Sequence, residues 1–393
     1  MTPNVRYDEA TTTVVENLGK EFTFQTSKKT VKNRFFKGPM SEKSTKFDDN
    51  DLKSSGIPDT RFVNFYEKWA AGGFGLISTG MILLDENGRR NSPGNMLIGP
   101  DEDSEERRTA FRAIADAVKP YNTILVGQLG HFADVHRYFA LEDNRDESAV
   151  KAALKDGIYA AKFFADCGFD GVIVSAAPGK LDKSQKLIKD FIEIIKKEVK
   201  DSSFVVGIKL RTPRLQQGGV SVEETYKLIE AIDSAGYDFM DIAGGSYEFP
   251  LADAAEREDR FREIVHGAKK HAPKTAIYVS GGIRKVKTME KLISEGIADG
   301  IGLARPATSE FDLPLQILKN NVQSALINPF ENDMATAVLA SAAQINQAGL
   351  ISLKDTKGDI NKGIMDLNNK VVLEKFNAAK AEGKFFSGVI VID

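Results

Sequence analysis

The sequence predicts a (β/α)8 barrel, an α/β fold in which eight parallel strands alternate with helices. Three observations predict it: short apolar runs rich in Val, Ile and Phe occur eight times, stretches of helical periodicity lie between them, and the pattern spans roughly 300 residues. Nearly continuous apolar runs indicate strands that are covered on both faces, as in a parallel sheet. A doubly wound sheet usually has fewer strands and a switch point, so the barrel is the better interpretation.

The predicted strands share one pattern, an apolar run that ends in small residues. In chain order they are NRFFKGPM (33–40), GLISTG (75–80), TILVGQLG (123–130), GVIVSAA (171–177), FVVGIKL (204–210), FMDIAGG (239–245), AIYVSGG (276–282) and GIGLAR (300–305). The stretches between them predict helices, several of which end at a glycine, and they include 61–73, 105–119, 148–168, 184–200 and 221–236.

We expect three parts along the chain. Residues 1–30 form an N-terminal lead-in, residues 31–330 form the barrel, and residues 331–393 form a C-terminal extension that packs on it. The extension contains helical segments, a loop rich in Gly, Asp and Lys (KDTKGDINKG) and a final apolar SGVIVID.

Composition excludes several classes of function. The 393 residues are 42% hydrophobic and 28% charged, and 53 basic against 56 acidic residues leave a formal charge of -3, so no basic surface favours nucleic acid or an anionic membrane. Cys167 is the single cysteine and the four histidines show no metal-ligand spacing beyond a weak His131/His136 pair, so we expect neither an internal disulfide nor a metal. No apolar run is long enough for a membrane span or signal peptide, and we expect a cytoplasmic protein, monomeric or homodimeric.

The last two strands predict a phosphate site. Barrels of this kind carry their active sites at the C-terminal ends of the strands, and the loops after the last two strands often bind phosphate through bare backbone amides and a helix N-terminus. Gly281 and Gly282 end the seventh strand, and Arg305 ends the eighth. The alternative is a tight turn at the glycines, with Arg305 paired to a surface carboxylate.

Four motifs, in this order and spacing, resemble those of the Old Yellow Enzyme group of FMN-dependent NAD(P)H oxidoreductases. They are KNRFFKGPM, FYEKWAAGGFGLISTG, VGQLGH and YVSGGIRKVKTMEKLISEGIADGIGLARPATSEFDLP. The resemblance runs from about residue 18 to about residue 328. It implies the barrel fold, an FMN cofactor, NAD(P)H as reductant and a small-molecule electron acceptor.

The resemblance also assigns residues to the flavin. Gln128 would present its amide to the pyrimidine edge, and Lys209 stands where relatives usually carry Arg near the N1/O2 edge, so the positive charge is kept without the planar fork. The residues that would line the isoalloxazine are Pro39, Met40, Ser41 and Gly80, and the phosphate cradle would be Gly281, Gly282 and Arg305. The alternatives are a buried glutamine bonded to backbone, a salt bridge of Lys209 across the barrel mouth, and simple core packing for Met40.

The fourth strand departs from the family pattern. Relatives carry there a histidine, a second His or Asn and a tyrosine, which grip the substrate and give a proton; in SAAPGKL these positions are Ser175, Pro178 and Lys180. Proline has no side-chain donor and serine cannot carry positive charge, so strong polarisation of an enone carbonyl is not expected from this loop.

Other groups on neighbouring loops are candidates to replace the lost ones. Our catalytic candidates are His131, Lys180 and Tyr247, with Ser175 and Arg211 as substrate-binding candidates and His136 and Tyr138 as further possibilities. The alternatives are a structural role for His131 and a solvated surface position for Lys180.

Three functions follow. The preferred one is an FMN-dependent NAD(P)H oxidoreductase that passes hydride or electrons to a quinone, dioxygen or a carbonyl-activated alkene. The second is a non-catalytic FMN-binding relative. The third is a Schiff-base aldolase that uses Lys209, a lysine at a strand end opposite a phosphate cradle.

Overall fold

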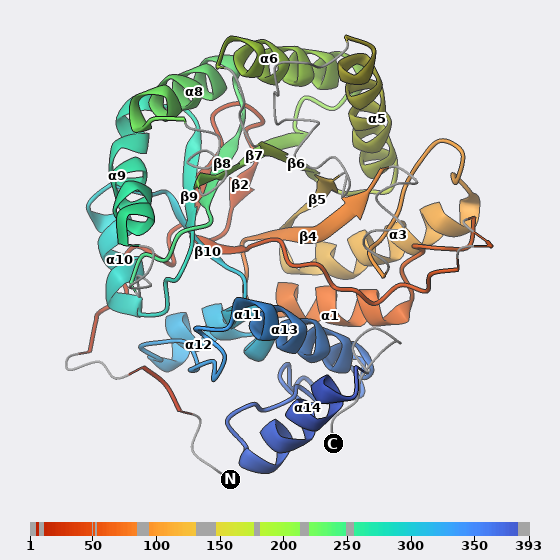
Figure 1. The fold of residues 1–393 in the computed structure, drawn as a ribbon, viewed down its shortest axis with the longest axis vertical. Helices are drawn as coiled ribbons and strands as arrows, with labels where there is room; N and C mark the ends of the chain where they lie inside the picture. Colours follow the sequence, from red (N-terminus) through yellow and green to blue (C-terminus); the bar gives the residue numbers. More distant parts are fainter. Residues whose placement is uncertain are drawn as a thin grey trace.

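The described part of the chain folds around one closed barrel of parallel strands (Figure 1). The structure, a computed structural model, describes residues 5–7, 12–48, 50–51, 53–84, 94–130, 147–176, 181–212, 220–248 and 255–383. Each barrel strand overlaps a run that the sequence predicted, although β4 extends three residues and β7 one residue beyond its run. The strands are β3 (Phe35–Lys37), β4 (Leu76–Leu83), β5 (Ile124–Gly130), β6 (Gly171–Ala176), β7 (Val205–Arg211), β8 (Phe239–Ala243), β9 (Ala276–Ser280) and β10 (Gly300–Leu303). Because β10 pairs with β3, the sheet closes, and the predicted (β/α)8 fold is confirmed.

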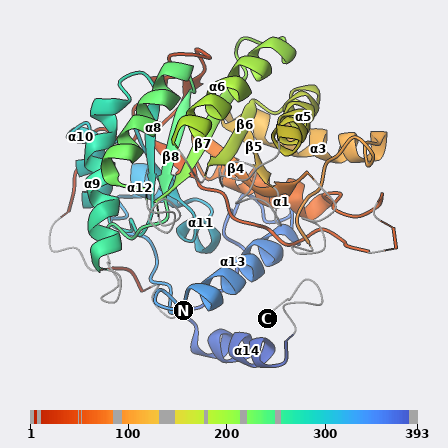
Figure 2. The same cartoon turned by 45° about the horizontal axis from the view of Figure 1, so that its top comes forward.

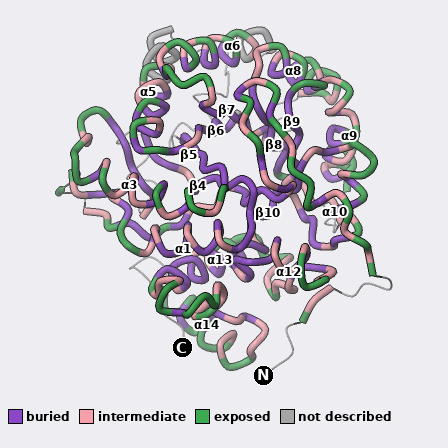
Figure 3. Tube along the Cα trace, turned by 180° about the vertical axis from the view of Figure 1, so that it is seen from behind, coloured by how far each residue is buried: buried purple, intermediate pink, exposed green. Residues whose placement is uncertain are grey.

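Helices surround the barrel in the order that the sequence predicted. They are α1 (Thr60–Ala71), α3 (Glu105–Val118), α5 (Glu147–Asp166), α6 (Leu181–Glu198), α8 (Val222–Ala235), α9 (Ala255–His271), α10 (Val286–Ser294), α11 (Pro306–Ser309) and α12 (Leu313–Asn320). Ordinary capping fixes their ends: Ser221 and Glu224 form a capping box on α8, and Gly236 ends that helix in the left-handed region. Buried residues follow the strands and the helix faces turned toward them (Figure 3). Within the described residues, no helix combines the length and apolarity that a membrane crossing needs.

The inside of the barrel is apolar at one end and polar at the other. Phe36, Leu76, Ile124, Val205 and Phe239 form a buried cluster at the N-terminal end of the strands. A hairpin of β1 (Phe22–Thr23) and β2 (Thr30–Val31) covers this end, where the ring of Phe24 stacks on that of Phe239 at 5.8 Å. Side chains alternate between the two faces of a strand, so the inward positions nearer the C-terminal ends are polar: Ser78, Gln128, Ser175, Lys209, Asp241 and Ser280.

Two C-terminal helices, α13 (Met334–Gly349) and α14 (Lys370–Ala381), lie outside the ring. Helix α13 runs alongside α1, and α14 lies on its outer side (Figures 1 and 2). Two side chains of α1 hold the end of α13: the Asn64 amide donates to the Gly349 carbonyl and the Lys68 ammonium to the Ala348 carbonyl, each at 2.7 Å. The extension is thereby tied to the barrel wall.

Candidate active site

The polar inner positions place a site at the C-terminal mouth of the barrel. Strand register puts Ser175, Lys209 and Asp241 level with one another on three adjacent strands. Ser175 is 7% exposed, Gln128 is 9% exposed, and the Asp241 side chain is fully buried. Sequence reasoning found Ser175, Gln128 and Lys209 but missed Asp241, although an acidic residue inside the apolar run FMDIAGG was a detectable signal.

Lys209 and Asp241 form a buried pair. The Lys209 ammonium lies 3.6 Å from Asp241 Oδ2, and the lysine side chain keeps 17% of its surface exposed. Neither Asp241 oxygen accepts a hydrogen bond of ordinary length and angle from a described residue. Burial raises the pKa of Asp241, while Lys209 and the nearby Ser280 hydroxyl act against it. Burial also lowers the pKa of Lys209, and the attraction of Asp241 opposes that shift. The salt bridge that the sequence left as an alternative for Lys209 is thus present.

Glu42 occupies the junction between the ends of β3 and β4. Its Oε1 accepts hydrogen bonds from the Tyr66 hydroxyl and, at 2.6 Å, from the Gly80 backbone N–H. The register of β4 shifts between Ser78 and Met81, which brings the Gly80 amide toward this carboxylate. A Cβ on Gly80 would lie 2.2 Å from Glu42 Oε2, so the position requires glycine. Sequence reasoning placed Gly80 at the site but gave no role to Glu42.

Lys37 provides the positive charge next to this carboxylate. Its ammonium donates to the Ser78 carbonyl at 3.1 Å and lies 4.1 Å from the centre of the Trp69 ring. Burial lowers the pKa of Lys37 to about 8, and the charge of Glu42 opposes that shift. The aromatic face and the carbonyl offset only part of the cost of burying this ammonium.

The glycines of the predicted phosphate corner form a tight turn, but the backbone amides that follow are not bare. Gly282 has φ +60°, and a Cβ there would lie 2.2 Å from the Ser246 hydroxyl oxygen, so the turn requires glycine. The amides after it are already bonded: Glu248 accepts from the N–H groups of Arg284 and Lys285, at 3.0 and 3.1 Å, where α10 begins. Burial raises the pKa of Glu248, and these backbone hydrogen bonds lower it.

Arg305 lies beside a second arginine at the same corner. Glu331, from the segment before α13, accepts from Arg284 Nη2 at 2.7 Å and lies 3.2 Å from Arg305 Nη2. Arg305 Nη1 is buried, and no described residue accepts a hydrogen bond from it. Two guanidinium groups share one carboxylate, so a positive charge and a free donor remain. The sequence alternative of a carboxylate partner for Arg305 is realised by Glu331, which sequence reasoning missed.

This corner fits the phosphate of FMN. A phosphate oxygen would satisfy Arg305 Nη1, a buried donor that no described residue pairs with. Lys209 and Gln128 supply a cation and an amide on the inner face nearby, as a flavin ring system requires.

The remaining predicted residues are distributed as follows. Pro39, Met40 and Ser41 are half-buried after β3, and Met40 packs against the main core. Arg211 ends β7 and is half-buried. The Tyr247 hydroxyl is hydrogen-bonded to His266 Nε2 on α9 at 2.9 Å, so it is directed toward an outer helix, which gives its predicted catalytic role no support. His131, His136, Tyr138, Pro178 and Lys180 lie outside the described residues.

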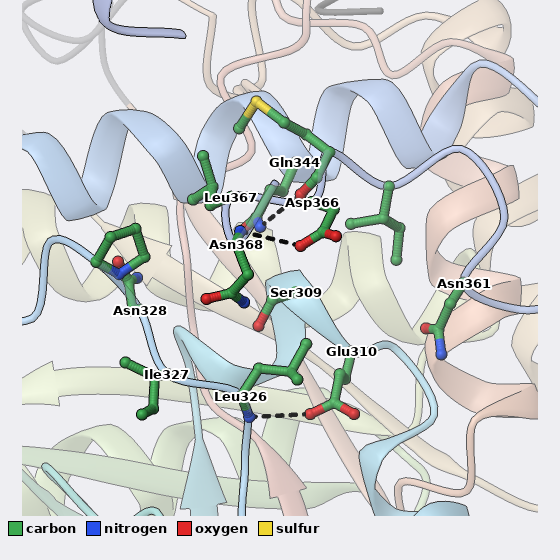
Figure 4. A pocket seen from close by; sticks show the side chains of 13 residues that line it. Ser309, Glu310, Leu326, Ile327, Asn328, Gln344, Asn361, Asp366, Leu367 and Asn368 are labelled. Atoms are coloured by element: carbon green, nitrogen blue, oxygen red, sulfur yellow. Dashed lines mark hydrogen bonds between the residues drawn. The ribbon is translucent and has the colours of Figure 1, made fainter. Parts of the chain in front are cut away.

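A cavity of about 200 Å³ lies away from the mouth, between α11 and the C-terminal segment 361–368 (Figure 4). Its polar groups bond to one another: the Gln344 amide donates to the Met365 carbonyl, and Glu310 accepts from the Leu326 N–H. None of the predicted site residues lines it. Nor do the described residues group three or more His, Cys, Asp or Glu side chains as a metal site would. The barrel mouth is therefore the candidate active site.

Solved structures share the fold. TcOYE, solved with pHBA, superposes with a TM-score of 0.61 at 16% identity, covering 82% of this chain and 97% of that one. The old yellow enzyme homologue from Zymomonas mobilis gives a TM-score of 0.59 at 17% identity, covering 79% of this chain and 94% of that one. For 2-naphthoyl-CoA reductase the TM-score is 0.61 at 18% identity, and this chain spans about half of that protein, 52%.

Curated relatives cover most of the chain, although no family model matches it. The NADH-dependent flavin oxidoreductase nadA of Aspergillus parasiticus is 26% identical over 383 residues, covering 84% of this chain and 85% of the relative. The NADH-dependent flavin oxidoreductase iliE of Hypocrea jecorina is 25% identical over 361 residues, covering 74% of this chain and 86% of the relative. The resemblance to the Old Yellow Enzyme group is confirmed.

The names of these relatives indicate the general class of enzyme. The curated relatives are named as NADH-dependent flavin oxidoreductases, which confirms the predicted enzyme class, an oxidoreductase. Flavin and nicotinamide are the cofactors that these names imply, as the sequence predicted.

Proposed function

We propose that this protein is an FMN-dependent NADH oxidoreductase of the cytoplasm that reduces a small molecule: a quinone, dioxygen or a carbonyl-activated alkene. The observation that carries the proposal is Arg305 Nη1, a buried cationic donor at the predicted phosphate corner for which the described part of the chain offers no acceptor. The names of the curated relatives support NADH over NADPH as reductant.

Different residues of the mouth would bind different parts of FMN. Arg305 would hold the phosphate, the Gln128 amide would pair with the pyrimidine edge, and Lys209 would supply positive charge at that edge. A flavin held there would supply two-electron redox chemistry between NADH and the acceptor. The protein groups orient both reactants in a mouth whose inner wall is largely buried.

The fourth strand bears on the choice of electron acceptor. Of the three positions where relatives carry the substrate grip and proton donor, Ser175 lies in the described part of the chain. Its hydroxyl is a weaker polarising group than an imidazolium. Quinones and dioxygen take electrons from a reduced flavin without a dedicated proton donor from the protein. We therefore place simple cyclic enones last among the acceptors, and fast turnover of cyclohexenone would contradict that order.

The experiment is an anaerobic titration of the FMN-loaded protein with NADH, and then with NADPH. We expect the oxidised flavin absorption to bleach with NADH and to return when a quinone is added. A protein that binds FMN but is not reduced by either nucleotide would be the non-catalytic relative. A protein that takes up no FMN would contradict the proposal.

A Schiff-base role for Lys209 is the second candidate. The lowered pKa of Lys209, caused by burial, favours the neutral amine that such chemistry needs. Borohydride reduction in the presence of an aldehyde or ketone sugar phosphate separates the two functions, because an aldolase would give a covalent adduct on Lys209 without any flavin.

A further inference from the structure

Asp241 is a buried acid that has no part in the proposed binding of FMN. It projects from the inner face of β8, level with Lys209 on β7, and its side chain has no exposed surface. Both of its oxygens lack a hydrogen bond of ordinary geometry within the described part of the chain. A buried carboxylate usually has such partners, and one without them calls for a specific explanation.

Lys209 lies nearest to that charge. The separation of 3.6 Å between Lys209 Nζ and Asp241 Oδ2 is longer than an ordinary hydrogen bond, so the contact is a loose ion pair. Lys209 is also the partly exposed member of the pair, at 17% against 0% for Asp241, and so the lysine faces the mouth with the acid behind it. Arg211, two residues further along β7, adds positive charge on the same strand.

We propose that Asp241 is a positioning residue that sets the charge Lys209 presents to the flavin, so that the cofactor faces a lysine–carboxylate pair and not a lone cation. This inference rests on the proposed function. A lone cation at the N1/O2 edge stabilises the negative charge that a flavin gains on reduction, and a carboxylate behind it cancels much of that effect. The pair therefore keeps the bound flavin easier to oxidise and favours electron transfer to the acceptor.

The test is the midpoint potential of the FMN-loaded protein, measured anaerobically against a reference dye. Asp241→Asn keeps the size and polarity of the side chain but removes its charge. We expect the equilibrium for reduction to shift about tenfold toward the reduced flavin, which for a two-electron couple is a rise of about 30 mV. Lys209→Met should shift the potential in the opposite direction.

The double variant tests whether Asp241 acts through Lys209. In the Lys209→Met background, Asp241→Asn should change the equilibrium less than twofold, because a buried acid without its cation is protonated and already neutral. Glu223→Gln is the matched control: it removes one negative charge from α8, where the side chain is 80% exposed, and should leave the potential unchanged.

Each outcome decides one question. An Asp241→Asn protein that binds FMN with an unchanged or lower potential would overturn the inference and leave the proposed function intact. A wild-type protein that binds no FMN would contradict the proposed function itself. A tenfold shift in Asp241→Asn that persists in the double variant would show a direct effect on the flavin and would also overturn the role through Lys209.

Discussion

Glu331 accepts a hydrogen bond from Arg284 at 2.7 Å, although the two residues lie 47 positions apart in sequence. The contact joins the segment before α13 to the loop after β9. The same oxygen, Glu331 Oε1, also lies 3.2 Å from Arg305 Nη2. A negative charge of the protein thus lies at the corner where we expect the phosphate of FMN.

Glu331→Gln should tighten FMN binding. The carboxylate repels a phosphate dianion, and relief of about 1 kcal/mol in a partly solvated site corresponds to about fivefold in the dissociation constant. Quenching of FMN fluorescence on titration with the protein measures it. Glu374→Gln on the exposed side of α14 is the control and should leave the affinity unchanged. Weaker binding in Glu331→Gln would mean that the carboxylate mainly orients the arginines.

Arg305→Gln should weaken FMN binding. The substitution removes a charged donor, and hydrogen bonds to charged groups contribute about 1.5–3 kcal/mol, or roughly 10- to 150-fold in affinity. The same fluorescence titration applies. Arg260→Gln, which breaks an exposed pair with Glu256 on α9, serves as the control. Equal affinities for the two variants would remove Arg305 from the phosphate site.

Gly80→Ala should destabilise the fold. A methyl group there would lie 2.2 Å from Glu42 Oε2 and 2.3 Å from the Met40 carbonyl oxygen, both in buried surroundings. Overpacking of this kind costs about 1–3 kcal/mol, which a urea unfolding curve resolves. Gly38→Ala is the matched control, because its nearest neighbour would be 3.6 Å away and the contact would be ordinary. Equal losses in both variants would contradict the close approach at Gly80.

The buried Lys37 should make stability depend on alkaline pH. Its pKa falls to about 8 in the folded protein because of burial, below the ordinary value of 10.5, so the unfolded chain binds more protons between these values. The free energy of unfolding contributed by Lys37 therefore rises as the pH increases from about 8 to 10.5. Unfolding curves of wild type and Lys37→Met should converge or cross as pH rises across this window. A difference between them that is constant with pH would contradict the prediction.

The fold could be predicted from the sequence because strands and helices follow local periodicity. Gln128 and Lys209 could be placed at the mouth for the same reason, since they lie two and four positions after the inward apolar residues Val126 and Val205 of their strands. The roles of three carboxylates could not be predicted. Glu42, Glu248 and Glu331 stand in loops without a periodic pattern. Glu248 and Glu331 contact residues 36 and 47 positions away, and Glu42 contacts a side chain of α1. Asp241 is the exception, because its place inside an apolar strand is itself informative.

The hairpin that covers Phe239 has a kinetic consequence. With one end of the barrel sealed by aromatic rings, a flavin bound at the mouth as proposed would be approached from the opposite side. Reductant and acceptor then have to visit one entrance in turn, each leaving before the next arrives. Steady-state rates should give parallel lines in double-reciprocal plots, and each reactant at high concentration should inhibit by blocking the entrance to the other.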